Sequence, residues 1–337
     1  MREALLYQRL KGNKVRCDLC AHRCVIHPGE QGICKVRVND NGRLYTKVYG
    51  RTIAQHIDPI EKKPLYHFYP GSKAYSVATP GCNFRCLFCQ NWDVSQLTDD
   101  AMLEQGEEAT PEQITLRAQH AGCASIAYTY TEPTIFFEYS YDTARLAHQA
   151  GLKNVYVSNG YMTAEMLDRV SPYLDAINID LKTFRDETYR RIIGARLKPI
   201  LENLKRIKQL GIWLEVTSLI IPAINDDTNE MSDMAHFVAE ELGVDVPWHI
   251  SRFFPAYNMK EIPPTPLETL QKAQEMGHQA GLHYVYLGNV QGDGAMDTRC
   301  PQCGHLLVQR SNFGTKRNSI ERGRCPQCGM EIAGVGM

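Results

Sequence analysis

Between residues 74 and 287 the chain alternates short, β-rich apolar runs with longer stretches whose apolar positions recur at helical spacing. The runs that predict strands are Ala74–Ala78, Ser125–Tyr128, Asn154–Val157, Ala176–Ile179, Trp213–Leu219, Val246–Ile250 and His283–Leu287. The stretches that predict helices, several of them followed by a glycine, are Pro111–Ala121, Thr134–Ala150, Ala164–Val170, Asp186–Ile193, Lys198–Leu210, Asp227–Leu242 and Pro266–Ala280. Because regular β-α alternation requires a parallel sheet, these units predict an α/β fold with a full or partial (β/α) barrel.

Cysteine positions divide the chain into three parts. The cysteines are Cys17, Cys20, Cys24 and Cys34 near the N-terminus, Cys82, Cys86 and Cys89 after the first predicted strand, the single Cys123, and Cys300, Cys303, Cys325 and Cys328 near the C-terminus. We therefore predict an N-terminal cysteine-rich metal-binding segment at 1–70, a core barrel at 71–292 and a zinc-ribbon-like tail at 293–337.

Composition narrows the class of protein. The chain has 337 residues, of which 43% are hydrophobic and 22% charged, with a formal net charge of −1, so it has the composition of a globular protein with a sizeable core. Lys and Arg are spread along it, which predicts neither nucleic acid nor membrane as a partner. With no apolar signal-like or membrane-spanning run, we expect a cytoplasmic location, where thiols stay reduced. The 12 cysteines therefore indicate metal or redox chemistry.

The segment from Thr79 to Trp92 follows the first predicted strand and holds Cys82, Cys86 and Cys89 in the spacing C-x3-C-x2-C. The carboxyl ends of barrel strands are where active sites lie. Three thiolates are one short of a saturated site, so one iron of a four-iron cluster would stay open to another ligand. The alternative is a structural zinc site completed by a further cysteine such as Cys123, which we instead expect to be a small buried hydrophobe.

With Gly81 before the first cysteine and Phe88 before the third, this motif resembles the signature of the radical S-adenosylmethionine superfamily. The resemblance implies a partial (β/α)6-type TIM barrel whose Cys82, Cys86 and Cys89 hold a [4Fe-4S] cluster that binds S-adenosylmethionine. It further implies that one electron from a flavodoxin- or ferredoxin-like donor cleaves S-adenosylmethionine to methionine and a 5′-deoxyadenosyl radical. That radical then abstracts a hydrogen atom from a substrate that the sequence does not name.

Polar residues follow the later predicted strands, where S-adenosylmethionine would bind. The candidates are Glu132 for its amine, Ser158 and Asn159 for its ribose, Asp180 with Lys182 for its carboxylate, and His249 near the same mouth. Each has an ordinary alternative, such as a helix start, a turn, a surface ion pair or a core histidine. Their common position at successive strand ends favours one binding site.

Residues 73–292 also resemble the activating enzymes of glycyl radical enzymes. The shared segments are Tyr130–Pro133, where Thr131 replaces the second glycine of Gly-Gly-Glu-Pro, and Ser158–Gly160, Asp180–Lys182, Ile221–Asp226 and Trp248–His249. Over nearly the whole chain the sequence is similar to the radical enzyme of the AmmeMemoRadiSam system, through Cys17–Cys24, Gly29–Cys34, Ser251–Tyr257, Tyr286–Asn289 and the terminal cysteines. That resemblance implies Memo-like and AMMECR-like partners, and the alternative is an activase for a glycyl radical enzyme.

The terminal cysteine groups predict further metal sites. Two Cys-Pro-Gln-Cys-Gly repeats hold Cys300, Cys303, Cys325 and Cys328, a spacing typical of structural zinc, with rubredoxin-like iron as the alternative. The spacing of Cys17, Cys20, Cys24 and Cys34 suits either zinc or an auxiliary iron-sulfur cluster. A third hypothesis for the whole chain is a non-catalytic electron carrier, which the polar strand ends disfavour because a carrier needs no nucleoside pocket.

Overall fold

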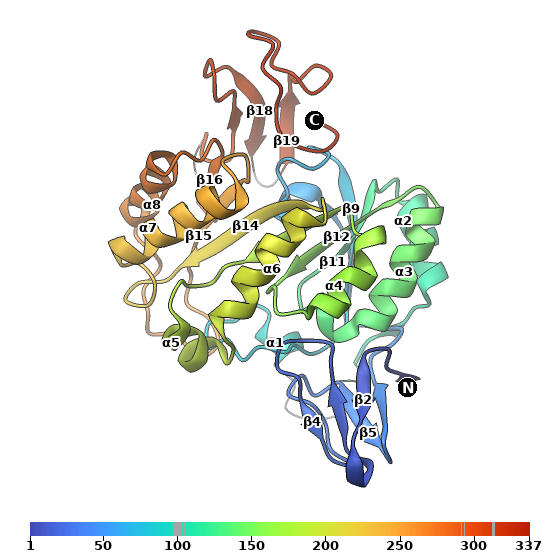
Figure 1. Ribbon diagram of the computed structural model, residues 1–337. Helices are drawn as coiled ribbons and strands as arrows, with labels where there is room; N and C mark the ends of the chain where they lie inside the picture. The colour runs from blue at the N-terminus through green and yellow to red at the C-terminus, as the bar shows by residue number, and fades with distance from the viewer. Residues whose placement is uncertain (97–102, 104, 291, 293, 312–313) are drawn as a thin grey trace.

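The computed structural model describes residues 1–96, 103, 105–290, 292, 294–311 and 314–337 (Figure 1). Residue 293, at the predicted start of the C-terminal tail, lies outside them. One sheet forms the centre of the molecule, with the N-terminal segment at one end and the C-terminal tail at the other (Figure 1). None of the helices in the described ranges is both long and apolar enough to span a bilayer.

The central sheet has eight strands in the order β16-β15-β14-β13-β12-β11-β9-β8. Their bounds are β8 Ala54–Pro59, β9 Lys73–Ala78, β11 Ser125–Tyr128, β12 Lys153–Ser158, β13 Ala176–Asp180, β14 Trp213–Ile220, β15 Trp248–Arg252 and β16 Val285–Gly288. Each pair from β9 to β16 is parallel, which confirms the predicted α/β partial barrel. The sequence pattern did not predict β8, which pairs antiparallel with β9 and makes the edge opposite β16.

Helices connect these strands where the sequence predicts them. Their bounds are α1 Trp92–Ser95, α2 Pro111–His120, η4 Pro133–Phe136, α3 Phe137–Gln149, α4 Ala164–Val170, η5 Ser171–Tyr173, α5 Asp186–Thr188, η6 Tyr189–Ile193, α6 Leu197–Gln209, α7 Thr228–His236, η7 Phe237–Leu242 and α8 Leu267–Gln279. Two predicted helices differ in geometry, because η6 and η7 are π-helical continuations of α5 and α7. Each π turn ends at a glycine with positive φ, Gly194 or Gly243.

Local sequence explains where these helices start and which face they bury. Thr110 and Gln113 form a reciprocal capping box at the start of α2, with Pro111 in the first helical position. α6 turns Ile200, Leu204 and Ile207 into the core, where each is fully buried, and packs on β14. Replacing one such leucine with alanine costs about 2–5 kcal/mol. The helices thus hold the sheet curved and its strand ends in place.

Small sheets form both terminal regions. The N-terminal elements are β1 Arg2–Glu3, β2 Tyr7–Arg9, η1 Lys11–Asn13, β3 Val15–Cys17, β4 Val25–Ile26, β5 Arg37–Asp40, β6 Arg43–Thr46, β7 Arg51–Thr52 with its partner β10 Glu107–Glu108, and η2 Ile60–Lys62. The C-terminal elements are β17 Thr298–Arg299, β18 Leu306–Ser311 and β19 Gly314–Asn318.

Backbone hydrogen bonds attach each terminal region to a different end of the barrel. The amide of Ala21 donates to the carbonyl of Tyr161 at 2.9 Å, so the N-terminal region lies against the carboxyl end of β12. The amide of Tyr69 donates to the carbonyl of Val335 at 2.8 Å, so the tail lies against the segment that leads into the amino end of β9. The sheet therefore has one end beside the N-terminal cysteines and the other beside the C-terminal ones (Figure 1).

Candidate active site

A cavity of about 480 Å³ opens inside the barrel, a size typical of small-molecule sites. It collects every candidate residue that the sequence placed on the barrel, which are Cys82, Cys86, Cys89, Glu132, Ser158, Asn159, Asp180, Lys182 and His249. Most of them follow the carboxyl ends of β9, β11, β12 and β13. Convergence of residues from separate strands on one cavity is the arrangement expected of a barrel active site.

The loop between β9 and α1 presents Cys82, Cys86 and Cys89 to this cavity. Two of its amides are fixed by the π turn η6, because Arg85 donates to the carbonyl of Ile193 at 2.8 Å and Leu87 to that of Ile192 at 3.0 Å. Gly81, with φ of 101°, makes the sharp entry that another residue would not adopt readily. The loop is thus held rigidly on the rim.

The three sulfur atoms are not drawn into a closed mononuclear site. In the parts of the chain that the structure describes, no three ligand atoms of this loop lie within 4.8 Å of one another. Cys123 does not line the cavity and is 6% exposed beside β11, so the zinc alternative that used it is wrong and the prediction of a small buried hydrophobe is confirmed. Three thiols spaced around an open cavity fit a larger group than a single ion, with one ligand position left free.

Burial raises the pKa of Cys86 to about 12 and that of Cys82 well above its ordinary value. Both side chains are therefore neutral thiols at pH 7 unless a metal replaces their protons. The loop would release protons when it binds iron, and the buried Phe84 and Phe88 give the cysteines apolar neighbours on the cavity wall.

Glu132 is the most highly bonded group of the rim. Its Oε1 accepts from the Thr134 amide at 3.0 Å, the Thr134 hydroxyl at 2.5 Å and the Ser158 hydroxyl at 2.8 Å, while Oε2 accepts from the Asn159 amide at 2.8 Å. Burial raises the pKa of this carboxyl, and those hydrogen bonds oppose the shift. Oε2 accepts only one of these hydrogen bonds, and a carboxylate oxygen has two lone pairs, so Oε2 retains room for one more donor.

The sequence predicted that Ser158 and Asn159 contact ribose, and the structure gives both side chains protein partners. The Ser158 hydroxyl donates to Glu132, and the Asn159 side-chain amide donates to Oδ1 of Asn83 at 2.7 Å. The single hydroxyl donor of Ser158 therefore binds Glu132 and positions its carboxylate. Asn159 in turn connects β12 to the residue that follows Cys82.

β13 ends at Asp180, so Lys182 lies two residues beyond the strand, and both side chains line the cavity. Lys182 Nζ is 3.0 Å from Asp180 Oδ2 and 5.8 Å from the centre of the Phe88 ring. Burial disfavours its ammonium form, but Asp180 together with Cys86 and Tyr189 outweighs burial, so the pKa of Lys182 is raised. Lys182 is thus a charged cation at the cavity wall beside the cysteine loop.

His249 lies deeper than predicted. β15 begins at Trp248, so His249 is at the start of the strand and not at its rim end. Its Nε2 is 2.6 Å from Oε2 of Glu215, a fully buried carboxylate that also accepts from the amides of Tyr66 and His67 at 2.9 and 2.8 Å. Burial raises the pKa of Glu215, but the hydrogen bond and charge of His249, with smaller contributions from His67 and Trp213, lower it overall. His249 therefore forms the floor of the cavity.

Residues of the N-terminal segment also line the cavity, and sequence reasoning missed them. Lys63 is buried with Nζ 2.7 Å from Asp58 Oδ2 and 4.3 Å from the centre of the Tyr130 ring. Burial lowers the pKa of Lys63 to about 8, while Asp58 opposes the shift. Tyr130 donates its hydroxyl to Asp58 and has a φ of 64°, in the left-handed region that favours glycine. The sequence signal that could have pointed to Tyr130 was its place in the motif, where it stands instead of the first glycine of Gly-Gly-Glu-Pro.

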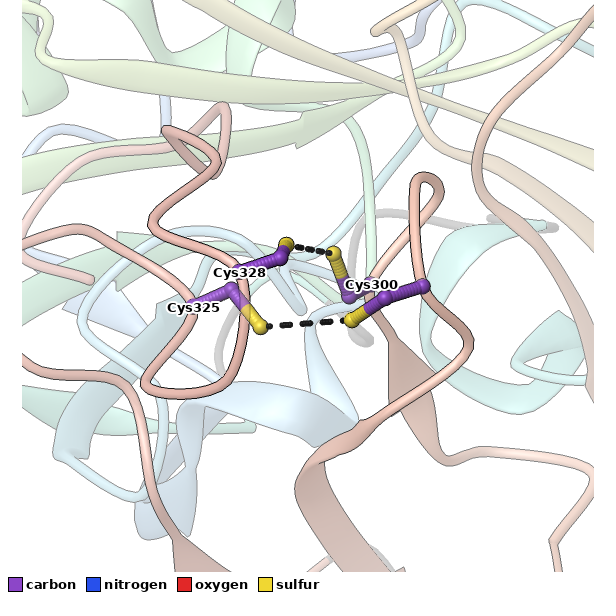
Figure 2. Close-up of side chains that lie close together, drawn as sticks. Cys300, Cys325 and Cys328 are labelled. Carbon is purple, nitrogen blue, oxygen red and sulfur yellow. Dashed lines mark hydrogen bonds between the residues drawn. The ribbon is translucent and has the colours of Figure 1, made fainter.

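The four C-terminal cysteines form a closed cluster (Figure 2). Their ligand atoms all lie within 4.8 Å of one another, with Sγ of Cys300 at 3.5 Å from that of Cys328 and Sγ of Cys303 at 3.7 Å from that of Cys325. A tetrahedral zinc with bonds of about 2.3 Å sets its sulfur atoms about 3.8 Å apart. The predicted grouping of the four cysteines is confirmed, and their spacing suits a metal ion.

Known proteins with similar sequences include members of a family that matches this barrel. The profile of the Radical SAM superfamily matches residues 76–238, from β9 to η7. A 47% identical relative, the uncharacterized protein MJ0808 of Methanocaldococcus jannaschii, aligns over 98% of this chain and 99% of its own. The pyruvate formate-lyase 1-activating enzyme of Escherichia coli is 22% identical over 50% of this chain and 71% of its own.

Among solved structures, Streptococcus suis SuiB bound to S-adenosylmethionine matches with a TM-score of 0.52 and 14% identity, over 69% of this chain and 53% of that one. This likeness supports the barrel fold. Fold, three-cysteine loop and relatives together define a radical S-adenosylmethionine enzyme, and the chain belongs to the radical SAM superfamily. Within that superfamily it is related to the pyruvate formate-lyase activating enzymes.

Proposed function

We propose that the chain binds a [4Fe-4S] cluster and S-adenosylmethionine in the 480 Å³ cavity and abstracts hydrogen from a small-molecule substrate, as the radical enzyme of an AmmeMemoRadiSam system. The observation that carries the proposal is the cysteine loop. Its three thiols lie on the cavity wall without closing a metal site, and they share that wall with a carboxylate and a cation. An electron carrier would need no such pocket.

Cys82, Cys86 and Cys89 would hold the cluster, which supplies the electron that cleaves S-adenosylmethionine to methionine and a 5′-deoxyadenosyl radical. Glu132 Oε2 has one free acceptor site and would take the ammonium of the methionyl group. Lys182 would balance its carboxylate. The buried Phe84, Phe88 and Tyr66 give the cavity apolar walls, which would limit side reactions of a radical once S-adenosylmethionine and substrate fill it. Ser158 positions Glu132 and touches no ligand in this account.

The tail and partners complete the proposal. Cys300, Cys303, Cys325 and Cys328 would hold structural zinc, because their sulfur spacing matches a single tetrahedral ion. A flavodoxin- or ferredoxin-like protein would donate the electron, and Memo-like and AMMECR-like proteins would act on the same substrate pathway.

Anaerobic reconstitution with iron and sulfide, followed by dithionite reduction with S-adenosylmethionine, tests the proposal through formation of 5′-deoxyadenosine. Cys82→Ala, Cys86→Ala and Cys89→Ala should each abolish the product. Cys123→Ala is the matched control, since it removes a buried cysteine outside the cavity and should leave product formation in place. Equal product from the three loop variants and the control would overturn the proposal.

A second candidate is an activase that installs a glycyl radical on a partner protein. The similarity to the Escherichia coli pyruvate formate-lyase 1-activating enzyme favours it. The two candidates differ in where the radical goes. A glycyl radical signal in the electron paramagnetic resonance spectrum of a partner with an Arg-Val-x-Gly-Tyr-like loop would support the activase, and substrate turnover that requires the Memo-like protein would support the first candidate.

A further inference from the structure

A second cysteine site lies on the N-terminal side of the cavity. Cys17, Cys20, Cys24 and Cys34 come from β3 and the loops after it, and the structure gathers all of them around one small hollow. The other walls are mainly apolar and include Leu19, Ile26, Ile33 and Ile135. Four cysteines on one dry hollow require explanation, because the fold could have filled the space with ordinary core side chains.

The sulfur spacing separates this site from the C-terminal one. Of the two four-cysteine groups, both described in full, only Cys300, Cys303, Cys325 and Cys328 have three or more sulfur atoms within 4.8 Å of one another. A single tetrahedral ion needs sulfur atoms about 3.8 Å apart. A four-iron cluster places each thiolate on a different iron and so needs wider spacing. The N-terminal site has the wider arrangement.

Arg37 supplies an independent indication of an anionic ligand. It is 1% exposed, it lines the same hollow, and its Nε and Nη1 have no hydrogen-bond partner, while Nη2 pairs with the buried Glu138. Buried donors without a hydrogen-bond acceptor destabilise the folded chain. The sulfides and thiolates of an iron-sulfur cluster are negatively charged acceptors that would satisfy them.

The N-terminal cysteine site is in direct contact with the active-site loop. His22 Nε2 is 2.8 Å from the carbonyl oxygen of Asn83, and Asn83 directly follows Cys82 while lining the N-terminal hollow. Arg85 of the loop donates to the carbonyl of Ile33, next to Cys34, and to the carbonyl of Cys82 at 3.0 Å. The two cysteine sites therefore share a wall.

We propose that Cys17, Cys20, Cys24 and Cys34 hold an auxiliary [4Fe-4S] cluster that relays electrons to the active-site loop. Four thiolates saturate the four irons, so this cluster has no open iron for substrate and electron transfer is the chemistry left to it. One electron leaves a flavodoxin- or ferredoxin-like donor, which is oxidised by one electron, and passes through this cluster to the one at Cys82. The metal assignment stands independently of the proposed function, whereas the relay rests on it.

Iron content tests the metal assignment. A Cys82→Ala/Cys86→Ala/Cys89→Ala variant keeps the N-terminal site intact, so after anaerobic reconstitution it should retain about four irons per chain and a dithionite-reducible cluster signal. A Cys20→Ser/Cys34→Ser variant should likewise fall from about eight irons to about four. A triple variant that carries no iron and two zinc ions would overturn the assignment, even if the other variant had misfolded.

The relay is tested by changing the reductant. The Cys20→Ser/Cys34→Ser variant should lose 5′-deoxyadenosine formation with a reduced flavodoxin as donor, while cleavage driven by dithionite persists because that small reductant enters the open cavity. Equal relative losses with both reductants would overturn the relay. If no chain cleaves S-adenosylmethionine with either reductant, the proposed function fails and the iron counts still decide the metal assignment.

Discussion

Glu132→Gln separates the role of Glu132 from that of Ser158. The amide keeps the size of the carboxylate but has one acceptor oxygen and one NH2 donor. Placed with its oxygen at Oε1, glutamine keeps the donors Thr134 and Ser158 and turns its NH2 toward the Asn159 amide, which donates to Oε2 at 2.8 Å in the native chain. One charge-assisted hydrogen bond is lost, and two donors then face each other.

The structure sets the size of the effect. Loss of a hydrogen bond to a charged group costs about 1.5–3 kcal/mol in the free energy of unfolding. The same change removes the acceptor for the S-adenosylmethionine ammonium, and a similar free energy corresponds to roughly 10- to 100-fold weaker binding. Ser158→Ala removes only one donor and leaves the carboxylate charge, so it should weaken binding far less.

Equilibrium binding of S-adenosylmethionine to the reconstituted variants, normalised to iron content, measures the first effect, and urea unfolding measures the second. Thr163→Ala is a matched control for loss of a buried hydroxyl, because Thr163 caps α4 and lies outside the cavity. If Ser158→Ala weakened binding as strongly as Glu132→Gln, the serine would touch the ligand directly and the reasoning would be refuted.

Three other perturbations test other parts of the structure. A closed four-thiolate site would hold a segment that is too small for a core of its own. Removal of the proposed tail metal with a chelator, or Cys303→Ser, should therefore make residues 298–335 sensitive to protease while the barrel resists. A tail that stays resistant would count against the proposed metal. His67 is buried, and burial lowers its pKa to about 4, below the ordinary value of about 6.5. As pH falls from 6.5, the imidazole of the unfolded chain is therefore protonated before that of the folded chain, and the free energy of unfolding should drop by about 3 kcal/mol by pH 4. His67→Gln should flatten this pH profile in urea unfolding. Tyr130→Phe removes the hydroxyl that donates to Asp58 and should cost about 1.5 kcal/mol in the same assay, and an unchanged stability would show that the bond contributes nothing.

The strands and helices of the barrel could be predicted because hydrophobic period and helix-ending glycines agree there. Strand β8 could not, because only one of the six residues of Ala54–Pro59 is buried and the strand lies at a sheet edge, so it lacks the apolar run that marks the buried strands. Its position matters for the site, since β8 supplies Asp58, which binds the Nζ of Lys63 at the cavity wall.

The candidate site could be predicted as a set of residues but not as a set of contacts. Strand-end position alone places Glu132, Ser158 and Lys182 on one rim, and the structure does place them there. Which of them is free to bind a ligand depends on hydrogen bonds between separate strands, such as that of Ser158 to Glu132. His249 was misplaced for a related reason, because the partner that fixes it, Glu215, lies 34 positions away on β14.

Electron paramagnetic resonance of the reduced active-site cluster tests the central claim most directly, that three cysteines leave one iron open to S-adenosylmethionine. The Cys20→Ser/Cys34→Ser chain would be used, so that the cluster at Cys82, Cys86 and Cys89 is the one observed. The account predicts that S-adenosylmethionine shifts the g values of the reduced cluster and that Glu132→Gln raises the concentration needed for the shift. A spectrum of a fully loaded cluster that stays unchanged at saturating S-adenosylmethionine would contradict it.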